Sequence, residues 1–315
     1  MPYKSYMKQI TVIVTVILSL ALTSPEFCAG RINGKVFSNS RQGEIQKQYV
    51  MPIELSKYGH IEIKAKVNNV EGTFILDTGA GINVITKKFA SKLGKIKMQD
   101  GSFTGFRATG EPLDMQLYTI SSLEIGDLQE RNSTFTILDV DLGKIDGLIS
   151  LASFKEQPFT IDYANKKLYL ESRRSLMGRE KNGKVIKIQL DDDRGVSVDM
   201  FTKVRVNNKL TLQISLDSGA GFNVFRFNAE YLKSLVGDTT NIKRYNKQSS
   251  LNAKDTNNFY LANLNSLALY DNPTVNVHDI KASFLKSLIY DGITSINWLG
   301  KCITIDIRKK ELIIN

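Results

Sequence analysis

Two aspartates in matching sequence contexts are the side chains of this chain best suited to acid–base chemistry. Residues 74–85 read FILDTGAGINVI and residues 214–225 read ISLDSGAGFNVF, with seven of twelve aligned positions identical. In each copy an apolar stretch runs into an aspartate, Asp77 or Asp217. Two carboxyl groups about 3 Å apart cannot both ionise, so such a pair shares one proton and offers a base and an acid together. The pair could deprotonate a water and protonate a carbonyl, which is the chemistry of peptide hydrolysis.

The residues that follow each aspartate have the sizes and polar groups that such a pair needs. A hydroxyl side chain next to each aspartate can hydrogen-bond the backbone of the other loop and fix the carboxyl geometry. The glycines permit a close approach of the two backbones. These supporting positions are Thr78, Gly79 and Ala80 in the first copy and Ser218, Gly219 and Ala220 in the second. A single Asp-Thr-Gly is typical of an ordinary turn, so the prediction depends on the repetition.

The elements around the two motifs are also repeated. Asp77 and Asp217 are 140 residues apart, Asp146 and Asp291 are 145 apart, and Asp162 and Asp306 are 144 apart, which indicates a duplicated domain. Alternating apolar residues at 61–67 and short apolar runs elsewhere predict strands. One stretch of helical spacing follows each motif, at 86–93 and at 228–235. The predicted fold is therefore all-β, with one short helix per domain.

The domain organisation follows from breaks in these patterns. Residues 50–170 are predicted to form the first domain and residues 185–315 the second. Between them, residues 171–184 (ESRRSLMGREKNGK) lack periodicity and are rich in charge, which predicts a solvated linker. The polar residues 31–49 are interpreted as an arm that leads into the first domain.

A glycine-rich stretch in the first half predicts a hairpin. Residues 100–120 contain three glycines around Phe103 and Phe106, followed by an alternating strand, which suits a mobile hairpin. The matching region of the second half, near 243–260, has no glycine. The two halves are therefore predicted to differ, with one hairpin-bearing and one supporting domain.

The first thirty residues are predicted to be a targeting segment. Lys4 and Lys8 precede an apolar run from Ile10 to Leu22, and small residues at 28–30 offer a cleavage point after Gly30. The run is short for a membrane-spanning helix, which needs about 20 residues. A cleaved secretory signal is the preferred interpretation, and an uncleaved N-terminal membrane anchor is the alternative. We therefore expect export to the periplasm or the medium.

The composition excludes several kinds of site. Only two histidines are present, in different halves, which argues against a catalytic His pair and a His-rich metal site, and no cofactor is expected. The formal net charge is +10, which could favour acidic substrates or an anionic membrane, although an ordinary lysine-rich surface is the preferred explanation. No basic stripe interleaved with aromatic residues indicates nucleic-acid binding.

The repeated motifs resemble those of the retropepsin-like aspartyl proteases, in particular bacterial members with a signal peptide and two such domains. The resemblance covers about residues 50–170 and 184–315 and rests on both aspartate motifs, on IDGLISL and FTIDYANKKLYL, and on YDGITSI and ITIDIRKKELII. It implies two β-barrel domains related by a pseudo-twofold axis, with Asp77 and Asp217 as the catalytic residues. It also implies a hairpin flap over a polypeptide substrate. Phe103 or Phe106 could lie at the tip of this flap, and the alternative is that these side chains pack in the core or a loop.

Two departures from the family pattern leave alternatives open. In the family an apolar pair followed by glycine braces each catalytic loop, whereas this chain has Ser150 and Ser295 at those positions, which predicts a small shift of the bracing strand. The preferred hypothesis is an exported, monomeric aspartic endopeptidase with its site formed within one chain. One alternative is an inactive peptide-binding or scaffold protein that keeps the fold. Another is that each domain pairs with a second chain, because the fourteen-residue linker permits either arrangement.

Overall fold

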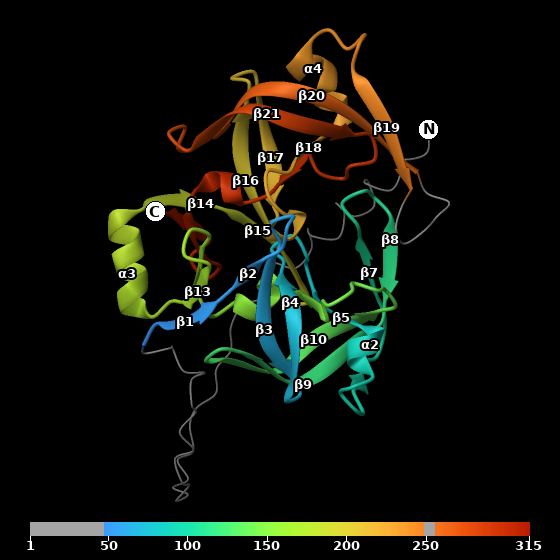
Figure 1. Cartoon of the computed structure of the whole chain (residues 1–315), viewed down its shortest axis with the longest axis vertical. Helices are drawn as coiled ribbons and strands as arrows, with labels where there is room; N and C mark the ends of the chain where they lie inside the picture. Colours follow the sequence, from blue (N-terminus) through green and yellow to red (C-terminus); the bar gives the residue numbers. More distant parts are fainter. Residues whose placement is uncertain (1–46, 249–255) are drawn as a thin grey trace, which may run out of the picture. The chain divides into compact units, whose positions relative to one another are not determined.

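Alternation of apolar and polar side chains directs most of the described chain into strands. The computed structural model describes residues 47–248 and 256–315 (Figure 1). The predicted targeting segment and residues 31–46 of the predicted arm lie outside the described residues. Within the part that is described, no helix is both long and apolar enough to cross a membrane.

The first domain is a barrel built on strands that alternate between core and solvent. Its sheet has the order β2-β3-β4-β11-β5-β10-β9-β6, and an additional pairing of β3 with β9 closes it. Phe74, Phe89 and Phe135 fill its interior with no exposed surface. The predicted helix after the first motif is a single turn, α2 (Lys87–Ala90), whose first turn is capped by the Thr86 side chain. The strands of this domain are β2 (Glu54–Leu55), β3 (Ile61–Val67), β4 (Val70–Leu76), β5 (Asn83–Thr86), β6 (Lys97–Met98), β7 (Phe103–Phe106), β8 (Pro112–Met115), β9 (Leu117–Ile125), β10 (Leu128–Leu138) and β11 (Gly147–Ile149).

The second domain repeats this arrangement. Its sheet has the order β15-β16-β17-β22-β18-β21-β20-β19, and a pairing of β16 with β20 closes it (Figure 1). Its helix, α4 (Leu232–Val236), follows a 3₁₀ turn at Ala229–Tyr231. The prediction of two tandem all-β barrels is therefore confirmed. The strands of this domain are β15 (Gln189–Asp193), β16 (Ser197–Val206), β17 (Leu210–Leu216), β18 (Phe225–Asn228), β19 (Lys243–Gln248), β20 (Thr256–Leu269), β21 (Asn276–Leu285) and β22 (Gly292–Thr294).

A third sheet is shared by the two halves of the chain. It has the order β1-β13-β12-β23-β24-β14. Its centre is the antiparallel pair β12–β23, in which Thr160 faces Thr304, 144 residues away, and their hydroxyl oxygens are 2.7 Å apart. Equivalent residues of the two halves therefore meet at the middle of this sheet. Its strands are β1 (Tyr49–Pro52), β12 (Phe159–Asp162), β13 (Lys167–Leu170), β14 (Lys184–Lys187), β23 (Cys302–Asp306) and β24 (Glu311–Ile314).

The segment 171–184, predicted as a solvated linker, contains helix α3 (Arg173–Asn182), which the sequence analysis did not predict. The helix begins with a capping box, in which Ser172 and Ser175 each accept a hydrogen bond from the backbone N–H of the other. Leu176 is its only buried residue among those described, so a hydrophobic period was absent from the sequence. Local capping and tertiary hydrogen bonds stabilise a helix that an apolar pattern could not predict.

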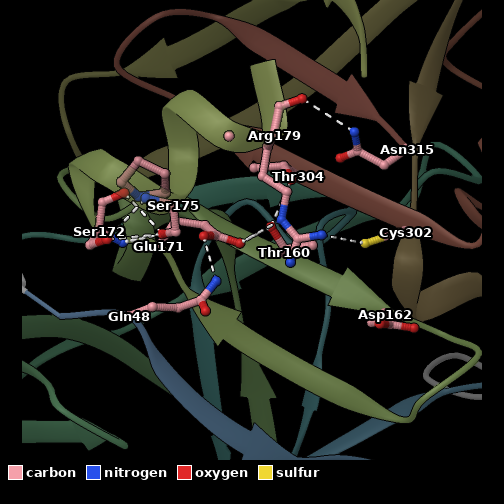
Figure 2. A network of polar contacts seen from close by, with 12 residues as sticks. Gln48, Thr160, Asp162, Glu171, Ser172, Ser175, Arg179, Cys302, Thr304 and Asn315 are labelled. Atoms are coloured by element: carbon pink, nitrogen blue, oxygen red, sulfur yellow. Dashed lines mark hydrogen bonds and ion pairs between the residues drawn. The ribbon is translucent and has the colours of Figure 1, made fainter. Parts of the chain in front are cut away.

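A buried carboxylate fastens α3 to the shared sheet (Figure 2). Glu171 accepts hydrogen bonds from Thr160 at 2.6 Å, from Gln48 at 2.8 Å and from Nε of Arg179 at 3.1 Å. Arg179 also donates to Sγ of Cys302, on β23, at 3.1 Å. Arg179 therefore contacts residues from both halves of the chain, and α3 is a fixed connection between them.

Candidate active site

Each aspartate of the repeated motif stands at the end of a buried strand. Asp77 follows β4 and Asp217 follows β17. The backbone N–H of Asp77 donates to Ile149 O at 2.9 Å, and that of Asp217 donates to Thr294 O at 2.8 Å. Strand β11 thus holds Asp77, and β22 holds Asp217, by the same backbone hydrogen bond.

The two loops are joined by four reciprocal hydrogen bonds. Thr78 Oγ1 donates to Leu216 O at 2.8 Å and accepts from Ser218 N at 2.9 Å. Ser218 Oγ donates to Leu76 O at 2.7 Å and accepts from Thr78 N at 3.0 Å. Both side chains are buried, so water does not compete for these bonds. The predicted role of Thr78 and Ser218 in joining the loops matches this geometry.

Glycine brings the two carboxyl groups together. A Cβ atom placed on Gly79 would lie 2.4 Å from Cγ of Asp217, and one placed on Gly219 would lie 2.3 Å from Cγ of Asp77. Each carboxyl group therefore occupies the space above the glycine of the other loop, which any side chain there would fill. The carboxyl groups of Asp77 and Asp217 therefore lie close to each other within one chain, and their titrations are coupled.

The electrostatics of the pair separate an acid from a base. Burial, and then the charge of Asp217, raise the pKa of Asp77 well above its ordinary value. Burial also raises the pKa of Asp217, but its hydrogen bonds to Asp77 and to the backbone N–H of Ala220, at 2.9 Å, counteract that rise. The two carboxyl groups therefore titrate as a coupled pair that shares one proton, so that one can act as an acid while the other acts as a base.

Ser150 and Ser295 are part of the bracing contacts. Ser150 N donates to Asn83 Oδ1 at 2.8 Å, and Ser295 N donates to Val224 O at 2.9 Å. Ser295 Oγ also accepts from Val224 N at 3.0 Å. Both serines are fully buried and hydrogen-bonded, and the strands before them still hold the aspartates.

The two loops differ in length after the shared glycines. Strand β5 begins at Asn83, six residues after Asp77, whereas β18 begins at Phe225, eight residues after Asp217. The pairing of β5 with β11 and of β18 with β22 shows the same difference in length, since Gly147 lies opposite Ile85 and the equivalent Gly292 lies opposite Phe227. The second loop is therefore two residues longer, and sequence-aligned positions beyond the glycines are not equivalent in space.

Sequence reasoning missed the residues that support each loop from the other domain. Ser197 and Asp199, on β16, lie against Gly81, and Val198 N donates to Gly81 O at 2.9 Å. In the matching place, Tyr58 and His60 lie against Gly221. Burial, and then the charge of Asp191, raise the pKa of Asp199 to about 6. No repeated motif marks these residues, because the two halves use different side chains for the same contact.

The predicted hairpin in the first domain is formed by β7 and β8, a separate two-stranded sheet. Phe103 is buried at its base, in an apolar cluster with Ile82, Met115 and Leu117, which fits a packing role. Phe106 is 61% exposed and lies opposite Pro112, beside the turn. At the turn, Ala108 O accepts a hydrogen bond from Ile289 N of the second domain at 3.1 Å, so the hairpin reaches from one domain to the other.

Part of the chain is similar to known proteins. Residues 63–152 match the family model described as aspartyl protease, a range that includes the first aspartate loop and its brace. Among solved structures, the chain is similar to a retropepsin-like aspartic protease from Rickettsia conorii, with 28% sequence identity, a TM-score of 0.29, and coverage of 40% of this chain and 91% of that one. None of the curated proteins matches the chain. The family match confirms the resemblance to retropepsin-like aspartyl proteases.

Proposed function

We propose that this chain, a retropepsin-like aspartyl protease by family and fold, is an aspartic endopeptidase whose dyad is Asp77 and Asp217. The observation that carries the proposal is the crossing of the two loops, which places each carboxyl group, partly buried, against the glycine of the other loop inside one chain. The coupled titration of the two groups supplies an acid and a base at one place.

The reaction would proceed by addition of water to the peptide carbonyl. Asp217, as the carboxylate, removes a proton from a water held between the two groups, while Asp77 gives its proton to the carbonyl oxygen. The resulting diol collapses as its C–N bond breaks, and the proton gained by Asp217 goes to the departing amine. A hydroxyl proton of the diol returns to Asp77, so the dyad ends with one proton, as it began.

An extended peptide fits the elements around the dyad. The β7–β8 hairpin contacts both domains, and backbone groups of an extended segment can pair with a strand edge. We also propose that the protein acts after export, on the basis of residues 1–30. The alternative of an inactive binding protein drew on Ser150 and Ser295, but their hydrogen bonds preserve the braces, so no observation on these serines favours it.

Substitution of either aspartate tests the proposal. Cleavage of a mixed peptide library is measured across pH 3–8 by mass spectrometry, with the wild type, Asp77→Asn and Asp217→Asn. Each variant is expected to lose activity by at least about 10³-fold, since one carboxyl group cannot provide both proton transfers. Asp127→Asn is the matched control, because Asp127 is exposed in the turn between β9 and β10. Cleavage that persists in both dyad variants would exclude the mechanism.

A further inference from the structure

A cavity of about 440 Å³ opens on the second domain. It is bounded by β18, β19, β20 and β21, and by residues 223–226, which continue the loop of Asp217. Tyr245 forms part of its wall and is held by a parallel stack on Phe259, with ring centroids 4.8 Å apart. The stacked Tyr245 ring therefore gives the cavity a fixed wall on the face of the sheet.

The charged groups of this cavity are cations. Arg226 and Lys281 line it together with neutral side chains, and no Asp or Glu is among its described lining residues. Neither cation has a hydrogen bond or ion pair with any residue in 47–248 or 256–315. A carboxylate placed here would meet two positive groups that form no ion pair with the described residues.

The position of Arg226 connects the cavity to the dyad. Arg226 lies opposite Ile293 on β22, and the carbonyl of the next residue, Thr294, accepts a hydrogen bond from the backbone N–H of Asp217 at 2.8 Å. Burial raises the pKa of Asp217, and the positive charge of Arg226 is one of the effects that oppose this rise. An extended peptide advances about 3.3 Å per residue and points alternate side chains to the same face. A side chain about two residues from the cleaved bond would therefore reach this cavity.

The first domain has no counterpart to this charge. Arg226 lies opposite Ile293 on β22, and Val84 lies opposite Leu148 at the matching place on β11. Leu261 of the second domain and Leu117 of the first domain also occupy matching places in their sheets. Leu117, however, belongs to an apolar cluster to which the hairpin contributes Phe103 and Met115. The same region is thus packed with apolar side chains in one domain and is open and cationic in the other.

From these contacts we infer that the cavity is a substrate subsite for an acidic side chain, Asp or Glu, about two residues from the cleaved bond. The inference rests on the proposed function and gives it a substrate class, peptides with an acidic residue on one side of the bond. It assigns Arg226 and Lys281 to substrate recognition, a role that the repeated motif does not reveal.

Cleavage of a mixed peptide library tests the subsite. We expect Asp and Glu to be enriched at one position beside the cleaved bonds. Two peptides of the best-cleaved sequence, differing only by Glu or Gln at that position, then give a ratio of kcat/KM. We expect the double variant Arg226→Gln/Lys281→Gln to lower this ratio about tenfold, and any general effect on the dyad cancels in the ratio. Lys209→Gln, in the exposed turn between β16 and β17, should leave the ratio unchanged.

A binding measurement separates failure of this inference from failure of the proposed function. A labelled decamer of alternating Glu and Ala, and its Gln–Ala counterpart, are titrated against Asp77→Asn at physiological salt, with anisotropy as the readout. The Glu peptide should bind about tenfold more tightly, and the added substitutions at 226 and 281 should remove the difference. Loss of cleavage with this preference retained would reject only the proposed function. Library cleavage without acidic enrichment, or equal binding of the two peptides, would overturn the subsite.

Discussion

We expect the carboxyl group of Asp77 to lower the stability of the folded protein at neutral pH. Its pKa in the fold is well above the ordinary value of 3.8, mainly because of burial. Between those two values the folded chain binds more protons than the unfolded chain, so the free energy of unfolding falls as pH rises. Below the unfolded value both states are protonated, and the effect disappears.

Asp77→Asn should therefore stabilise the protein at neutral pH. An amide keeps a donor towards Asp217 and cannot ionise, so we expect a gain of about 1 kcal/mol, or about 2 °C in Tm, at pH 7. At pH 3 the difference from the wild type should nearly vanish. Thermal unfolding by circular dichroism at the two pH values measures it. A gain of equal size at both would show that ionisation is not the cause.

Sequence reasoning at the residue scale found what the two halves share and missed what distinguishes them. Asp77, Asp217, Thr78 and Ser218 were predicted because a motif repeats, and the structure brings all four together. Arg226 was missed because two extra residues in the second loop move it to the place held by Val84 in the first domain. A repeat reports common geometry, whereas recognition of a substrate depends on the positions that have diverged.

Among the elements, α3 shows the limit of periodicity as a predictor. Its residues are mostly charged, so its helical state depends on the capping box and on Arg179, which lies near Glu171 and Cys302 only in the folded chain. The strands were predictable because each carries its own alternation, as in β3. The β7–β8 hairpin was predictable from its glycines, but its contact at Ile289 depends on the tertiary fold.

Arg179→Ala should weaken the connection between the halves. Glu171 would remain buried with one hydrogen bond fewer and without its cation, and we expect a loss of about 2 kcal/mol in the free energy of unfolding. Urea denaturation measures the change. Arg174→Ala is the control, since Arg174 is exposed on the same helix. If both variants lost the same stability, the contact with Glu171 would not be the cause.

For the molecule as a whole, duplication brings the two aspartate loops together inside one chain. The shared sheet pairs β12 with β23, and the hydrogen bonds of Thr78 and Ser218 join the two loops of the same chain. The all-β duplication was predictable from the 140-residue and 144-residue offsets. The sequence could not predict whether the two paired halves belong to one chain or to two, because the same residues could meet between two chains.

Activity measured on mixed variants distinguishes these two arrangements. Asp77→Asn and Asp217→Asn are refolded together from denaturant, so that domains of different chains have the opportunity to pair. If the site forms within one chain, every site contains one substituted aspartate and the mixture stays inactive. In a site shared between chains, the intact Asp77 domain of one variant would meet the intact Asp217 domain of the other, and activity would return. We expect no recovery, together with a wild-type rate proportional to protein concentration from about 1 nM to about 1 µM, since no association step precedes catalysis.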